Sequence, residues 1–170
     1  MNPFSRPALR TGTSYVIWNK ATGKALDGGT AQASVVQWTY TGLPQQRWTL
    51  EEGYAGGVYR LRCERSGQFL TCRSGSGATQ ETTDHHFWRI EPAQDGAFLL
   101  HQDYAGSFLH TPDANKDSGR QPRLGGEQLL RPEPLVLRRA CPGAVDAPPR
   151  REHHHRIPKE SPRDRTDDRP

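Results

Sequence analysis

The stretch that decides the fold is Tyr15-Val-Ile-Trp-Asn-Lys-Ala-Thr-Gly23-Lys-Ala-Leu26, because it returns twice along the chain. The second copy spans residues 59–70, 44 residues on, and the third spans residues 98–109, 39 residues further. In each copy, apolar and other side chains alternate, a turn containing glycine follows, and a second short apolar segment ends at leucine. A period of two followed by a turn glycine predicts a β-hairpin.

The end of the repeating unit also recurs. Gln46-Arg47-Trp48 matches His86-Phe87-Trp88, and Gln128-Leu129-Leu130 is a fainter third copy. Three units of about 40 residues each have room for about four short strands. One such unit alone would expose an apolar face and open strand edges, whereas three units close a six-stranded barrel capped by hairpins.

Strand alternation predicts which side chains of each copy face the barrel interior. In the second copy the inward residues are Tyr59, Leu61 and Cys63, and the outward residues are Arg60 and Arg62. The same register applied to the first copy places Tyr15 and Ile17 in the core. It places Trp18, which aligns with Arg62 and His101, on the outside.

Composition divides the chain into a domain and two flanking segments. All 14 aromatic residues lie between Phe4 and Phe108, and residues 142–170 carry only four apolar side chains beside six prolines. A segment so poor in apolar surface does not offset the entropy of ordering, which predicts a disordered tail. We therefore expect an N-terminal extension at 1–12, one all-β domain at 13–139 and a disordered tail at 140–170.

Several classes of protein are excluded by the same reading. No apolar run approaches the length of a membrane span, and no secretory signal is seen at the N-terminus, so a cytoplasmic location is expected over classical secretion. The net charge of +4 comes from mixed signs, with no basic run interleaved with aromatics, which argues against nucleic-acid binding. No nucleophile motif assembles, so no enzyme activity and no cofactor are predicted.

Metal and disulfide chemistry are not predicted either. Histidines 153–155 lie in the charged tail, and residues 113–119 imitate a calcium loop but lack its glycine position and its bidentate glutamate. A four-residue turn after Cys63 would offset Cys63 from Cys72 by about 13 Å along the strand, too far for a disulfide. The three cysteines, the third being Cys141, are expected to be free thiols.

The threefold repeat, with its Gly-hairpin, its Leu26-Asp27 pair and its closing Gln46-Arg47-Trp48, resembles the ricin B-type lectin family. The resemblance covers about 125 of the 170 residues and implies a β-trefoil fold. It also implies that an Asp after the second strand's leucine binds sugar hydroxyls and that an aromatic on the third strand stacks on the sugar ring. The closing Gln and Trp then mainly support the core.

The first copy carries the whole set that the resemblance implies. Predicted sugar contacts are Asp27, Trp38, Gln45, Gln46 and Gly28; accessory contacts are Trp18 and Tyr40; structural residues are Trp48 and Trp88. Gln45 departs from the asparagine usual in the family. Each role has a structural alternative: Asp27 as a turn cap, Trp38 as a packing residue and Gly28 with Gly29 as turn residues.

The other two copies lack the sugar-binding set. At the position of Asp27 they carry Thr71 and His110, and no aromatic between Thr71 and Phe87 replaces Trp38. In the third copy, Leu130 is expected where Trp48 and Trp88 close their units. We therefore expect at most one functional site.

The predicted function is a non-enzymatic carbohydrate-binding module, with galactose-type glycans as candidate partners. The first alternative is a trefoil that binds a protein partner and has lost sugar binding, with Trp18 as an outward contact. A second alternative is a protease inhibitor acting through the loop at 111–124.

Overall fold

The structure is a computed structural model that describes residues 8–29, 34–73, 75–83, 85–104, 106–111, 117–125 and 135–140. Residues 141–170 of the predicted tail, residues 113–116 of the calcium-like stretch at 113–119 and the faint closing motif at 128–130 lie outside these residues. Among the described residues, no helix is long and apolar enough to cross a membrane.

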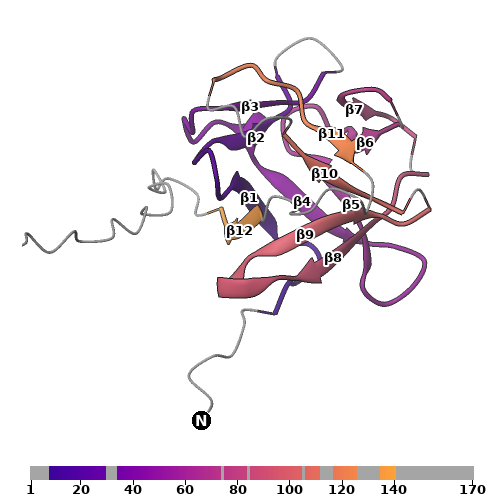
Figure 1. Ribbon diagram of the computed structural model, residues 1–170. Coiled ribbons are helices and arrows are strands. Elements are labelled where there is room, and N and C mark those ends of the chain that lie inside the picture. Colours follow the sequence, from indigo (N-terminus) through magenta and orange to yellow (C-terminus); the bar gives the residue numbers. More distant parts are fainter. Residues whose placement is uncertain are drawn as a thin grey trace, which may run out of the picture.

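Six strands form a closed ring. They are β1 (Ser14–Asn19), β4 (Trp48–Glu52), β5 (Val58–Cys63), β8 (Trp88–Pro92), β9 (Phe98–Gln102) and β12 (Leu135–Arg139). Each of them pairs antiparallel with the strand before and after it, and β12 pairs with β1, so this ring has no free edge. The predicted six-stranded barrel is therefore present, and in Figure 1 its long strands β4, β5, β8 and β9 cross the middle of the molecule.

Three hairpins cap one end of the barrel. They are formed by β2 (Ala25–Asp27) with β3 (Val36–Trp38), β6 (Phe69–Cys72) with β7 (Ala78–Glu81), and β10 (Ser107–His110) with β11 (Arg123–Gly125). Figure 1 shows the three hairpins gathered at the upper end of the ring. A barrel of six strands closed by three hairpins confirms the predicted all-β trefoil.

The three hairpins meet at equivalent residues. The backbone N–H of Val35 donates to the carbonyl of Ala78 at 2.9 Å, and the N–H of Ala78 donates to the carbonyl of Pro122 at 2.6 Å. Proline has no N–H, so a third bond of this kind from Pro122 is impossible. The third repeat is therefore joined to the cap by one backbone bond fewer than the symmetry would allow.

The barrel interior holds the core as the alternation predicted. Tyr15, Ile17, Leu61 and Cys63 are buried, and Arg62 on the other face of β5 is exposed. Leu9 of the N-terminal extension also packs against this core. The predicted hairpin register is confirmed, because Cys63 N–H donates to Gln68 O at 2.8 Å.

Candidate functional site

The β2–β3 hairpin brings the two main predicted sugar contacts to the same face. Asp27 pairs with Val36, and Ala25 pairs with Trp38. Because side chains two residues apart on a strand share a face, Asp27 and Trp38 project from one side of the hairpin. Leu26, which lies between Ala25 and Asp27 on β2, projects toward the core.

Asp27 has the turn-capping role that the sequence left open as an alternative to sugar binding. Its carboxylate is largely buried, and Oδ1 accepts a hydrogen bond from the backbone N–H of Gly29 at 2.7 Å. This bond is the turn cap of the structural alternative. Within the described part of the chain Oδ2 has no hydrogen-bond partner. One oxygen therefore fixes the side chain, and the other is available as an acceptor.

Trp38 presents an open aromatic surface on the same face of the hairpin as this carboxylate. Its side chain is 45% exposed. The edge of its ring lies against Gly119, because a Cβ atom added to Gly119 would be 3.5 Å from Cζ3 of Trp38. That segment of the third repeat is fixed to the strand because Gly119 N–H donates to Gln37 O, and Gln37 N–H donates to Arg120 O, each at 2.8 Å. The third repeat thus supports the Trp38 ring from one side.

The two glutamines before Trp48 lie on the short 3₁₀ helix η1 (Pro44–Gln46) and differ in role. Gln46 is fully buried; its Oε1 accepts from Thr41 N–H at 2.7 Å, and its Nε2 donates to Thr39 O at 2.9 Å. Both ends of its amide are therefore committed to holding the chain between β3 and η1. Gln45 is bound by its main chain to the site, since its carbonyl accepts from Gly28 N–H at 2.9 Å.

Gly28 faces the protein interior. A Cβ at this position would lie 2.9 Å from Cys63 Sγ and 3.2 Å from Gln80 Oε1, and Gln80 Nε2 donates to the Gly28 carbonyl. The close packing inside the domain thus requires glycine here without any ligand. A backbone contact from Gly28 to a sugar remains a prediction.

The expected exposure of Trp18 is wrong. Trp18 lies on the outer side of the barrel wall, as alternation predicted, but its side chain is 0% exposed. The Tyr40 ring lies over it, with ring centroids 4.8 Å apart, and Val136 and Ala140 pack on the same cluster. A fully covered indole makes no contact with a ligand, so Trp18 is a packing residue, and Tyr40 is its cover.

Trp48 and Trp88 both lie in the core. Both indoles are fully buried, and each donates its Nε1–H to the carbonyl of the leucine that precedes the site position, Leu26 or Leu70, at 3.0 Å. These bonds tie the first two cap hairpins to the barrel.

The assignment of the third closing residue to Leu130 is wrong. Trp48 pairs with Cys63, and Trp88 pairs with Gln102. Asn19 aligns with Cys63 and Gln102 in the repeat, and it pairs with Leu135 on β12. The third unit therefore closes five residues later than the faint Gln-Leu-Leu motif indicated.

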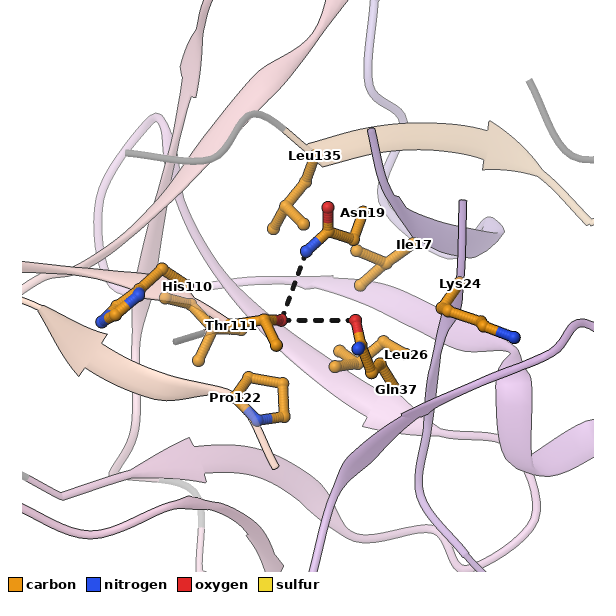
Figure 2. A pocket seen from close by; sticks show the side chains of 10 residues that line it. Ile17, Asn19, Lys24, Leu26, Gln37, His110, Thr111, Pro122 and Leu135 are labelled. Carbon is orange, nitrogen blue, oxygen red and sulfur yellow. Dashed lines mark hydrogen bonds between the residues drawn. The ribbon is translucent and has the colours of Figure 1, made fainter. Parts of the chain in front are cut away.

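A small pocket lies at this weakened junction (Figure 2). It has a cavity volume of about 20 Å³, room for a water-sized group. Figure 2 shows Thr111 at its centre, bonded to Asn19 Nδ2 at 3.2 Å and to Gln37 Oε1 at 3.5 Å. Leu109 and Leu135 both line the pocket, and they occupy the positions that Leu26 and Trp48 hold in the first repeat. None of the predicted sugar contacts lines it. A leucine side chain is smaller than an indole, which accounts for this space.

The second repeat contains a polar cluster that the sequence did not reveal. Tyr104 O–H and His86 Nδ1 are 3.0 Å apart, and His86 Nε2 lies 3.6 Å from Glu81 Oε2. Burial lowers the pKa of His86 below its usual value, with Glu81 acting in the opposite direction. Tyr104 comes from the third repeat, so only folding brings its ring beside His86. Among the described residues, no cluster suits a metal ion.

A comparison with family models matches the ricin-type β-trefoil lectin domain-like family over residues 6–83 and 44–124. The chain belongs to this family. No curated protein matches the sequence.

Solved structures show the same fold. The designed threefold-symmetric protein ThreeFoil is 24% identical, with a TM-score of 0.65, covering 73% of this chain and 96% of its own. The Macrolepiota procera ricin B-like lectin, solved with lactose, is 20% identical, with a TM-score of 0.67 and coverage of 76% and 97%. SeviL, solved with the asialo-GM1 saccharide, is 16% identical, with a TM-score of 0.62 and coverage of 77% and 100%.

Proposed function

We propose that this chain is a non-enzymatic carbohydrate-binding module with one sugar site in the first repeat. The observation that carries the proposal is the placement of Asp27 and Trp38 on one face of the β2–β3 hairpin. A half-exposed indole offers a flat surface for the C–H face of a sugar ring, and an anchored carboxylate accepts hydrogen bonds from its hydroxyls. Gln45 adds an amide at the edge of the same site.

Galactose-type glycans are the proposed ligands. Support comes from two structural neighbours whose complexes contain lactose or the asialo-GM1 saccharide. A shallow site with few polar groups should bind a simple glycoside with a Kd of about 0.1–1 mM. Stronger attachment to a surface would then depend on several copies acting together.

The test is glycan binding by titration calorimetry or a broad glycan array with the substitutions Asp27→Asn and Trp38→Ala. Asparagine keeps the side-chain oxygen that caps the turn at Gly29 and removes the charge, so it separates sugar binding from turn formation. Each variant should weaken binding at least about tenfold, a loss of about 1.4 kcal/mol. Tyr54→Ala removes another highly exposed aromatic, on the β4–β5 loop, and is the matched control.

Binding that survives both substitutions would place the site elsewhere. A wild-type protein that binds no glycan would favour the alternative, a trefoil that recognises a protein. That alternative has lost one of its supports, because Trp18 is covered by the protein's own side chains.

A further inference from the structure

Arg65 belongs to the second repeat but lies at the edge of the first-repeat site. It occupies the turn between β5 and β6, and its Nη1 donates to Gln45 Oε1 at 3.4 Å. Gly67, with a φ of 70°, shapes this turn, and its N–H donates to Cys63 O at 2.8 Å. The preceding residue Glu64 also reaches the first repeat, where Oε2 lies 2.8 Å from Arg47 Nε. Two contacts thus hold the turn against the residues around η1.

The next pair of repeats is arranged in the same way. Tyr104 occupies the equivalent turn of the third repeat, and its hydroxyl lies 3.0 Å from His86, the counterpart of Gln46. A side chain from the following repeat therefore contacts one of the two residues before Arg47 in the first repeat, Gln45, and one of the two residues before Phe87 in the second repeat, His86. The identity of that side chain, arginine or tyrosine, differs between the repeats and gives each position its own chemistry.

The charge of Arg65 is not neutralised by an acid. Within the described residues it forms no ion pair, its side chain is exposed, and its one hydrogen bond goes to the neutral amide of Gln45. Glu64 is committed to Arg47 and to the Ser14 hydroxyl. Lys24, on the other side of the hairpin, is likewise bound to a neutral group, since its Nζ donates to Thr39 Oγ1 at 2.8 Å.

We propose that Arg65 gives the first-repeat site a preference for galactose-type glycans that carry an anionic substituent, a carboxylate or a sulfate. This inference rests on the proposed sugar site. Asp27 and Trp38 hold the ring, and the planar guanidinium of Arg65 binds the anionic group with its remaining N–H donors. The preference is built from two repeats, and for this reason no single repeat of the sequence displays it.

The experiment measures the Kd values of lactose, 3′-sulfolactose and the methyl glycoside of galacturonic acid for the full chain, at low and high salt. The anionic ligands should bind about three- to fivefold more tightly than lactose, as expected for one solvent-exposed charge pair, and high salt should reduce this ratio. Arg65→Gln should reduce the ratio to about one. The matched control is Arg62→Gln, because Arg62 is also exposed but is paired with Glu51 at 2.6 Å.

Equal binding of neutral and anionic ligands by the wild-type protein would overturn the inference and leave the sugar site standing. A preference that persists in Arg65→Gln, or that Arg62→Gln abolishes equally, would overturn the role of Arg65. If no ligand of the three bound and the array were silent, the proposed function itself would fail, and the inference would fail with it.

Discussion

The indole Nε1–H of Trp88 donates a hydrogen bond to the carbonyl oxygen of Leu70 at 3.0 Å, in the same way that Trp48 reaches Leu26. Each bond crosses from a barrel strand to a cap hairpin. In the third repeat Leu135 occupies the tryptophan position and has no donor. The anchoring of the cap is therefore strong in two repeats and weak in the third.

Substitution of phenylalanine for two buried tryptophans should separate hydrogen bonding from packing. Trp88→Phe removes a hydrogen bond and leaves the Leu70 carbonyl unpaired, whereas the Nε1 of Trp18 is buried without a partner among the described residues. Because both variants lose similar ring volume, Trp88→Phe should cost about 1–3 kcal/mol more than Trp18→Phe in the free energy of unfolding. Urea titration at neutral pH measures this difference, and equal losses would contradict the role of the bond.

Gly28→Ala should destabilise the domain because of a steric conflict with the core. The new methyl group would lie 2.9 Å from Cys63 Sγ. An overpacked interior of this kind typically costs about 1–3 kcal/mol. The matched control is Gly56→Ala, since a Cβ at Gly56 meets no atom within 4 Å. Thermal unfolding should show a clear decrease in Tm for the first variant only; equal Tm values would mean that the contact relaxes freely.

The stability of the domain should decrease on acidification through His86. Burial lowers its pKa in the folded state, so the unfolded chain binds a proton first as the pH falls. The contribution of neutral His86 to the free energy of unfolding is fully present above the ordinary histidine pKa of about 6.5. It is lost as the pH falls below that value toward the folded-state pKa. His86→Gln places the neutral residue of the first repeat at this position. The variant should lose less stability than wild type between pH 7.5 and 5.5 in urea titrations, and identical pH profiles would exclude His86 as the cause.

The thiol of Cys72 should resist modification in the folded protein. Burial raises its pKa to about 11, which leaves about one thiolate in a thousand at pH 8. In a Cys141→Ser background, only Cys63 and Cys72 remain, and both are buried. A disulfide-exchange reagent should therefore react with neither thiol in native buffer and with both in urea. Rapid labelling of the native variant would show that the β6–β7 hairpin opens readily.

The repeat by itself determined the fold. Three copies of a Gly-hairpin, each with an alternating strand, predicted a barrel with a cap, because only closure of three such units buries their apolar faces and pairs their edges. Alternation also placed Tyr15, Ile17 and Leu61 inside correctly. It assigned Trp18 to the outer wall correctly but not to solvent, since the Tyr40 ring that covers it comes from beyond β3.

Tertiary structure decided the remaining features, because they depend on contacts between repeats. The third closing residue is Leu135, and only strand pairing with β1 revealed it. Arg65 and Tyr104 each contact a residue of the preceding repeat. Aligning the three repeats by sequence does not reveal contacts from one repeat to the next. Local sequence specifies strands and turns through short-range sterics and burial, whereas the side chains that surround a site are selected by how the three units close on one another.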